Sequence, residues 1–229
     1  WTVLTRDRTH GLVEQVVWSP DGSRIYFDRR TDGPGGVYSV PALGGDERLV
    51  LENAGTPVPL PDGSLLVTRI NADRQYQFHR LSPGTGQLDP LPIGPVATAV
   101  VAGATQVLRD GRVLTLGEPL RGDDRTPGLY TVSLDTGEIR RFGPRAAVED
   151  IRSLAVRPGD GAVLVVLRDA STYRVLEYPP DGAGEPRSVL TLLSTPRLTL
   201  SPDGAIYASI TERPGEVLRF DARGGAIES

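Results

Sequence analysis

The chain has 229 residues, a formal net charge of −4, and neither cysteine nor lysine, so all 25 of its basic residues are arginine. This composition excludes a thiol nucleophile, a disulfide, a thiolate metal site, a Schiff-base lysine and a lysine-dependent phosphate loop. The small negative charge argues against nucleic acid as a partner, and no apolar run approaches the roughly 20 residues that span a bilayer.

Five Asp-Gly turns divide the chain into similar segments. Their glycines are separated by 41, 48, 50 and 43 residues, and they are Gly22, Gly63, Gly111, Gly161 and Gly204. Each turn precedes a run of β-branched and aliphatic residues. A period of about 40–50 residues with four short strands per unit is typical of propeller blades. The spacing therefore predicts an all-β fold, a β-propeller of four-stranded antiparallel blades.

The first segment serves as the template for the others. We expect strands at 13–18, 23–28, 37–40 and 47–51. Pro20 and Gly22 lie in the turn between the first two strands, where proline fixes φ and glycine takes the left-handed conformation. A glycine pair at 44–45 connects the third strand to the fourth.

The later segments repeat this order. The expected strands are 58–60, 64–70 and 76–81 in the second, 106–108, 112–116 and 129–134 in the third, 151–156, 162–167 and 174–178 in the fourth, and 197–200, 205–210 and 217–220 in the fifth. Second strands such as 162–167 are apolar at successive positions, which indicates a strand covered on both faces.

The two ends of the chain suggest how the blades close into a ring. Residues 1–5 have the pattern of a fourth strand with no blade before it, whereas the last segment has only 226–227 left for its own fourth strand. We therefore predict a single domain over 1–229 with five blades, the last one closed by the N-terminal strand, because a closed ring leaves few exposed edges. The alternative is an open fragment of a six- to eight-bladed ring, and Trp1 in place of methionine favours a piece of a longer chain.

Two motifs resemble known propeller repeats. Residues 18–22 (Trp-Ser-Pro-Asp-Gly), followed by 25–27, 37–40 and the glycine pair 44–45, resemble a TolB-type WD40-like repeat. Residues 200–204 form a second copy, with leucine in place of the tryptophan. The resemblance implies a β-propeller over nearly the whole chain.

A longer stretch resembles a more particular group. Residues 25–80, with Tyr-Ser-Val-Pro at 38–41 and Leu-Pro-Asp-Gly-Ser-Leu-Leu at 60–66, are similar to the propeller on the C-terminal side of bacterial serine/threonine protein kinases. That resemblance implies a sensory or interaction module. The kinase motifs themselves are absent from this sequence, so it implies the regulatory part of such a protein.

The residues with catalytic or metal-binding potential are few. His10 and His79 are the only histidines, His79 is expected on a third strand, and no Gly-x-Ser-x-Gly elbow is present, so a Ser-His-Asp site is not indicated. Two histidines are too few for a histidine-rich metal site. We therefore predict no catalytic residues, no metal and no cofactor.

Three short motifs favour solvated loops over binding sites. Residues 121–125 contain an Arg-Gly-Asp tripeptide and two adjacent aspartates. Asp28 and Asp32 lie near a glycine cluster. Clustered carboxylates suit calcium, but a solvated loop is the simpler interpretation of both. The glycine cluster also lacks the helix and lysine of a phosphate cradle.

The first strands of the blades are expected to line the central channel. Their polar residues include Glu14, Gln106, Arg152 and Arg197. Converging arginine and glutamate side chains bind a carboxylate or a peptide terminus, or pair with one another and seal the channel. We name these four residues as the candidate ligand-binding set.

The sequence therefore favours a non-catalytic propeller that binds a protein or peptide partner, or a small ligand, without nucleic acid or membrane contact. One alternative is an enzyme, because 201–204 and 218–221 are also similar to gluconolactonase-like and lyase propellers. Another is the gating propeller of a prolyl-oligopeptidase-type peptidase.

Overall fold

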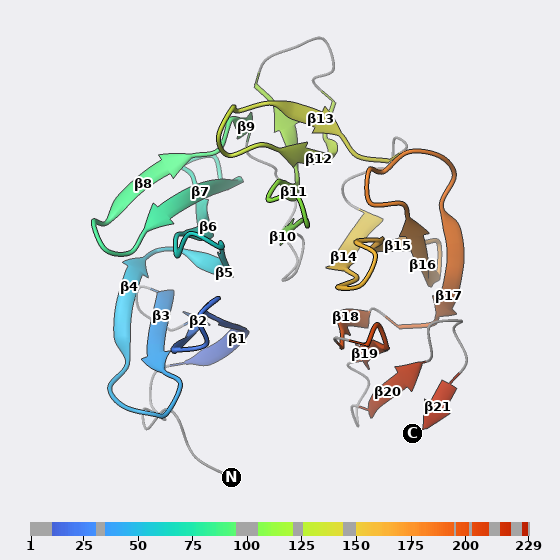
Figure 1. Ribbon diagram of the computed structural model, residues 1–229, viewed down its shortest axis with the longest axis horizontal. Coiled ribbons are helices and arrows are strands. Elements are labelled where there is room, and N and C mark those ends of the chain that lie inside the picture. Colours follow the sequence, from blue (N-terminus) through green and yellow to red (C-terminus); the bar gives the residue numbers. More distant parts are fainter. Residues whose placement is uncertain are drawn as a thin grey trace. The chain divides into compact units, whose positions relative to one another are not determined.

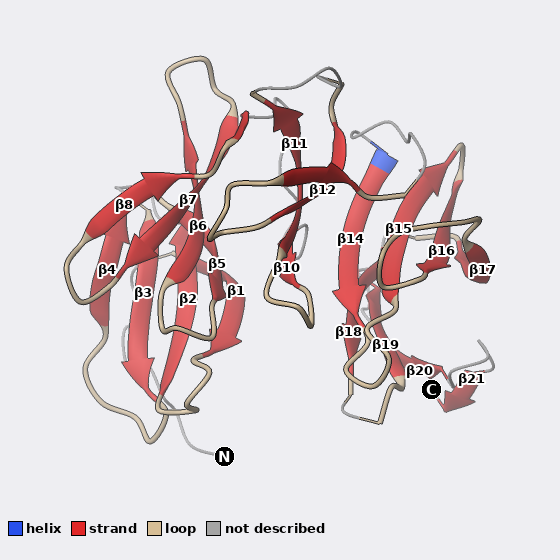
Figure 2. Ribbon diagram, turned by 45° about the horizontal axis from the view of Figure 1, so that its top comes forward, coloured by secondary structure: helices blue, strands red, loops and turns tan. Residues whose placement is uncertain are grey.

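The computed structural model describes residues 11–30, 35–94, 105–120, 126–143, 150–194, 196–201, 203–210, 216–220 and 226–228. Strands joined by loops make up nearly all of this part of the chain (Figure 2). The prediction of an all-β fold is confirmed. Within the described residues no helix has the length and apolar character needed to cross a membrane.

The chain divides into two compact units, residues 1–99 and 100–229. The first unit contains two sheets, coloured blue to green in Figure 1. The first sheet consists of β1 (Leu12–Trp18), β2 (Arg24–Arg30), β3 (Gly36–Pro41) and β4 (Arg48–Glu52). The second consists of β5 (Gly55–Pro59), β6 (Leu65–Ile70), β7 (Tyr76–Ser82) and β8 (Gln87–Pro90), and the short strand β9 (Ile93–Gly94) follows it.

The second unit contains three sheets of the same kind. The third sheet has β10 (Thr105–Val107), β11 (Val113–Pro119), β12 (Gly128–Val132) and β13 (Ile139–Arg141). The fourth has β14 (Ile151–Val156), β15 (Val163–Asp169), β16 (Thr172–Tyr178) and β17 (Arg187–Leu192). The fifth has β18 (Pro196–Leu200), β19 (Ile206–Ile210), β20 (Glu216–Phe220) and β21 (Ala226–Glu228).

In every sheet these four strands lie in chain order and each pairs antiparallel with the next. One sheet therefore corresponds to each predicted repeat. Consecutive sheets within a unit also contact one another: β5 contacts β1, β2 and β3 in the first unit, and β14 contacts β10 and β18 in the second. The blade number of a closed ring, and a single domain over 1–229, stay predictions.

The Asp-Gly turns join the first strand to the second in all five sheets. In each turn the aspartate Oδ1 accepts a hydrogen bond from the backbone N–H two residues later, and the glycine has a φ between 68° and 85°. The donor–acceptor distances are 3.0 Å for Asp21–Ser23, 3.0 Å for Asp62–Ser64, 3.1 Å for Asp110–Arg112, 3.0 Å for Asp160–Ala162 and 3.5 Å for Asp203–Ala205. Aspartate supplies the acceptor and glycine the left-handed backbone, which is why this dipeptide recurs.

The hydrophobic core lies between consecutive sheets. On β15, Val163 and Val165 pack in the cluster shared with the third sheet, whereas Leu164 and Val166 pack in the cluster shared with the fifth. All four are at most 1% exposed. In the first unit, the first two sheets share a cluster of Tyr26, Val37, Leu65, Val67 and Leu81. The prediction that such a strand is covered on both faces is confirmed for β15.

The last sheet differs from the expectation for its fourth strand. Ala226–Glu228 pairs with β20 and takes that place, so the C-terminal end of the chain supplies the fourth strand. Residues 1–5, which we expected there, lie outside the described residues.

We predict that Gly63→Ala destabilises the chain by about 1–2 kcal/mol, because alanine is strained in the left-handed region. Gly63 has a φ of 83° and nothing lies within 4 Å of an added Cβ, so only the backbone opposes the change. Gly84→Ala is the matched control, since its surroundings are equally open and its φ is not in that region. Denaturant unfolding should show a lower free energy of unfolding for Gly63→Ala and no decrease for Gly84→Ala. Equal effects would contradict the role of the turn.

Candidate functional site

The four residues chosen from the sequence all lie on first strands. Glu14 is on β1 in the first unit, and Gln106, Arg152 and Arg197 are on β10, β14 and β18 in the second. Glu14 Oε2 forms an ion pair of 3.2 Å with Nε of Arg30, on the neighbouring strand. Glu14 therefore has a local partner within its own sheet.

The other three residues are on strands that lie next to one another. β14 contacts both β10 and β18, and Ser153 Oγ on β14 accepts a hydrogen bond of 3.5 Å from the backbone N–H of Leu198 on β18. In the third sheet, the backbone N–H of Leu108 donates to the carbonyl of Arg112 and closes the turn after β10, and Gln106 lies two residues before Leu108. In the fifth sheet, the N–H of Ser201 donates to the carbonyl of Ala205 in the same way, and Arg197 lies four residues before Ser201. At about 3.3 Å per residue, Gln106 and Arg197 differ in height along their strands by about 7 Å.

Arg152 lies in an irregularity of β14. Ile151 is opposite Leu167 and Ser153 is opposite Val166, so Arg152 is the extra residue of a β-bulge. Its side chain is half-buried. Among the described residues it has no hydrogen-bond or ion-pair partner. Bulges often redirect a side chain next to a functional site.

Arg157, on the turn after the same strand, shows the contrasting situation. Its Nη1 lies 3.0 Å from Asp160 Oδ2 and its Nη2 lies 2.6 Å from Glu177 Oε2. Hydrogen bonding to Glu177 is the main cause that raises the pKa of Arg157. The guanidinium of Arg157 is therefore used within the fold, whereas that of Arg152 has no hydrogen-bond or ion-pair partner among the described residues. A guanidinium can form charge-assisted hydrogen bonds to a carboxylate.

Asp28 is buried, in contrast to the solvated loop expected from the sequence. It is 7% exposed, so the prediction of a solvated loop is wrong for this residue. Its Oδ1 accepts from the backbone N–H of Gln15 at 2.6 Å and its Oδ2 from that of Thr56 at 3.1 Å. Gln15 lies in the bulge of β1 and Thr56 in the bulge of β5. The carboxylate therefore connects the first two sheets.

Thr56 itself is held in an uncommon conformation. Its φ is 48°, a genuine outlier for a β-branched residue. Its Oγ1 hydrogen-bonds to Thr68 Oγ1 at 2.7 Å, and Thr68 Oγ1 also donates to the carbonyl of Gly55 at 3.1 Å. Both oxygens of Asp28 are thus used to fix this bulge and that of β1. Within the described residues no cluster of three or more histidine, cysteine, aspartate or glutamate side chains is placed to hold a metal ion.

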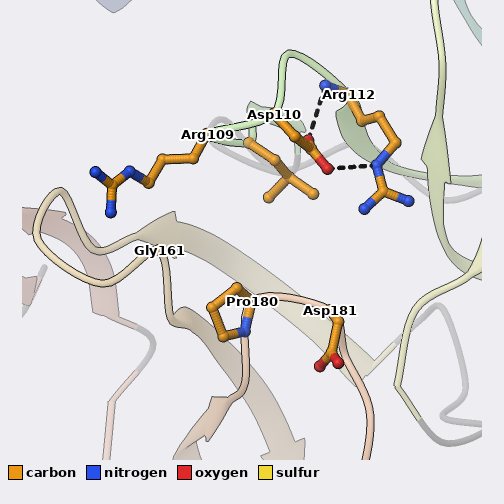
Figure 3. Close-up of a pocket in the computed structure, with 7 residues that line it drawn as sticks. Arg109, Asp110, Arg112, Gly161, Pro180 and Asp181 are labelled. Carbon is orange, nitrogen blue, oxygen red and sulfur yellow. Dashed lines mark hydrogen bonds and ion pairs between the residues drawn. The ribbon is translucent and has the colours of Figure 1, made fainter.

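A small cleft of about 220 Å³ lies in the second unit between turns of the third and fourth sheets (Figure 3). It is lined by Leu108, Arg109, Asp110, Arg112, Gly161, Pro180 and Asp181. Asp110 accepts from the backbone N–H and Nε of Arg112 at 3.1 and 2.7 Å. The cleft is smaller than the roughly 300–1,000 Å³ of drug-sized ligand sites. Its size suits a single side chain.

The turn carboxylates are the most perturbed acids among the described residues. Hydrogen bonding from the Ser64 hydroxyl lowers the pKa of Asp62 to about 2, with further contributions from the Ser64 backbone and from Arg80. The pKa of Asp21 reaches the same value, mainly through Ser19. These groups stay ionised in any physiological setting, and their charge serves the turn.

His79 lies on β7, the third strand of its sheet, as predicted. Partial burial lowers its pKa, and Nδ1 lies 3.2 Å from the carbonyl oxygen of Gln77. His10 and residues 121–125 lie outside the described residues, as does Asp32. Within the part of the chain that the structure describes, the one hydrogen-bond contact of the His79 ring is with the backbone carbonyl of Gln77.

Comparison with known proteins identifies the fold. No protein-family profile matches the sequence, and no curated protein matches it. Many solved structures match the fold. TolB from Acinetobacter baumannii superposes with a TM-score of 0.72 at 18% identity, over 94% of this chain and 53% of that chain. The chain therefore spans about half the length of that protein.

Two other matched structures are enzymes by name. A gluconolactonase from Xanthomonas campestris has a TM-score of 0.63 at 16% identity, over 95% of this chain and 75% of that chain. A puromycin hydrolase has a TM-score of 0.57 at 20% identity, over 89% of this chain and 34% of that chain. Together these likenesses establish a TolB-type β-propeller fold, which hosts both enzymes and other proteins.

We predict that Asp62→Asn makes the stability of the chain less sensitive to acid. The pKa of Asp62 is about 2 in the folded chain against an ordinary 3.8. The folded state therefore gains stability above pH 3.8, and this gain is lost as the pH falls through about 2. The free energy of unfolding, measured with denaturant between these two pH values, should fall less steeply with decreasing pH for the variant than for the unmodified chain. Asp135→Asn, at an exposed site, controls for net charge. An unchanged slope in Asp62→Asn would contradict the assignment.

Proposed function

We propose that this chain is a non-catalytic β-propeller that binds a protein or peptide partner, as a sensing or interaction module of a larger bacterial signalling protein such as a serine/threonine kinase. The TolB-type fold supports a docking platform, since propellers present loops and inner strands around a rigid scaffold. The kinase context rests on the sequence resemblance of residues 25–80.

The buried and turn aspartates that the structure describes also support binding over catalysis, because their hydrogen bonds and ion pairs stabilise the fold. Asp28 fixes two bulges, and Asp62 and Asp110 fix turns while pairing with Arg80 and Arg112. Each group has a structural role that accounts for its contacts. A catalytic acid or base instead needs a poised pKa at a substrate-accessible position.

The single observation that carries the proposal is Arg152. It is a half-buried arginine in the bulge of β14, the first strand of the fourth sheet, and its side chain has no hydrogen-bond or ion-pair partner among the described residues. Its guanidinium provides donors for one carboxylate, such as a peptide C-terminus or an acidic side chain, and Gln106 and Arg197 occupy the adjacent first strands. Charge-assisted hydrogen bonds to a carboxylate are about twice as strong as neutral ones. A small acidic ligand is the second occupant this chemistry accepts.

The alternative is an enzyme, because gluconolactonase and a puromycin hydrolase share the fold. A lactonase-like chemistry requires convergent metal ligands, whereas the charged and amide residues on the described first strands of the second unit are Gln106, Arg152 and Arg197. A gating role beside a peptidase requires a hydrolase partner. Binding of a partner or ligand therefore accounts best for the arginine and glutamine residues on these first strands.

We predict that Arg152→Gln weakens binding of a peptide carboxylate at least about tenfold, the factor expected for losing one charge-assisted hydrogen bond of about 1.5–3 kcal/mol. The probe is an acetylated tetra-alanine with a free C-terminus, titrated against the chain and followed by the Nε–H resonances of arginine in NMR spectra. The same peptide with a C-terminal amide should bind weakly to both proteins.

Arg69→Gln is the matched control, because Arg69 is also half-buried and also has no hydrogen-bond or ion-pair partner among the described residues, but it lies on β6 in the first unit. It should leave the titration unchanged. Equal binding by acid and amide peptides, or equal losses in both variants, would contradict carboxylate recognition. Turnover of a lactone in the presence of a divalent ion would favour the enzyme.

A further inference from the structure

Two arginine positions of the candidate set lie close together in the second unit. Arg152 is on β14 and Arg197 is on β18, and these two first strands contact one another. The residue after each arginine takes part in a hydrogen bond between the strands, because Ser153 Oγ accepts from the backbone N–H of Leu198 at 3.5 Å. The backbone therefore brings these two positions side by side.

Contacts nearer the turns show that β14 and β18 run in the same direction. Ala155 belongs to the same hydrophobic cluster as Leu198 and Leu200. On the turn after β14, Cδ of Arg157 lies 3.7 Å from the point where Gly204, on the turn after β18, would carry a Cβ. The turn ends of the two strands are thus neighbours, as are the ends that carry the arginines.

The two arginines are also at nearly the same height along their strands. Arg197 is opposite Ser209, which lies four residues beyond Ala205, where the turn of the fifth sheet closes. Arg152 is the extra residue of its bulge and falls between positions four and five residues beyond Ala162, where the turn of the fourth sheet closes. At about 3.3 Å per residue, the two heights differ by at most about 3 Å.

The positive charge at this height is not neutralised by the strands themselves. β14 and β18 contain no aspartate or glutamate, and Ser153 is neutral and 1% exposed. The described acidic residue nearest to Arg152 in the sequence is Asp150, whose Oδ1 already lies 3.2 Å from Nη2 of Arg168. Two neighbouring guanidinium groups repel each other unless an anion lies between them, so this place favours a ligand with more than one negative charge.

We propose that Arg152 and Arg197 together bind two neighbouring carboxylates, as found on the last residue of a peptide that ends in aspartate or glutamate. This inference rests on the carboxylate recognition proposed above for Arg152 and adds the second charge of the ligand. Each guanidinium forms charge-assisted hydrogen bonds to one carboxylate. A free dicarboxylic acid offers the same two groups, and the experiment distinguishes these two sources.

The first test uses two acetylated peptides with free C-termini and the unmodified chain. The peptide Ala-Ala-Ala-Glu should bind about tenfold more tightly than Ala-Ala-Ala-Gln, because an additional hydrogen bond between charged groups contributes about this factor. The glutamine peptide has nearly the same shape and lacks the second charge. Binding is followed by the Nε–H resonances of arginine in NMR spectra.

Glutarate, titrated in the same way, identifies the source of the two carboxylates. An affinity equal to that of the glutamate peptide supports the paired site and assigns it to a free dicarboxylate. A weaker affinity, with the preference between the peptides intact, supports the paired site and assigns it to a peptide terminus.

Arg197→Gln tests the second arginine. It should reduce the preference for the glutamate peptide from about tenfold to none, whereas Arg197→Lys, which keeps the charge, should retain part of the preference. Arg69→Gln removes the same charge from β6 in the first unit and should keep the full preference. The measured quantity is the ratio of two affinities in one protein, so a difference in the folded fraction between variants cancels.

Three outcomes would overturn the proposal. Equal binding of the two peptides by the unmodified chain would do so and would leave recognition of a single carboxylate by Arg152 standing. A preference that survives in Arg197→Gln would do so because another group would then supply the second charge. Absence of binding by both peptides and by glutarate would overturn it together with the function proposed above. A preference that is lost in Arg197→Gln and kept in Arg69→Gln supports it.

Discussion

The structure depends on burying both faces of its central strands. β15 shows this most clearly, because alternate residues along it belong to separate clusters shared with the third and the fifth sheets. A sheet with two apolar faces is stable only between two neighbours. Consecutive sheets are therefore obligatory for one another, and the surfaces left for binding are turns, inner strands and outer edges.

The bulges of the first strands involve two charged side chains, the buried Asp28 and the half-buried Arg152. In the first unit, the bulges around Gln15 and Thr56 direct their backbone N–H groups at Asp28, which satisfies both with one carboxylate. In the second unit, the bulge at Arg152 carries a guanidinium whose donors the described residues do not satisfy. The first arrangement stabilises packing between sheets. The second is the kind of incompletely satisfied group that a ligand completes.

The features that local sequence determines were predictable, and those that depend on distant contacts were not. The Asp-Gly turns and the strands that follow them appeared where expected, because turn chemistry and β-branched runs act over a few residues. Asp28 was misjudged because its main partners lie 13 and 28 residues away. One sign was available: an aspartate directly after Ile-Tyr-Phe in an apolar strand. The bulge that places Arg152 depends on the register with β15, which a single sequence does not specify.

The central claim is that the inner strands of the second unit bind a carboxylate without reacting with it. A crystal structure of the chain with the acetylated tetra-alanine acid tests this most directly. We expect the peptide's terminal carboxylate within hydrogen-bonding distance of the Arg152 guanidinium, with the peptide intact. A peptide bound elsewhere, a cleaved peptide, or a metal ion held by carboxylates on these strands would contradict it.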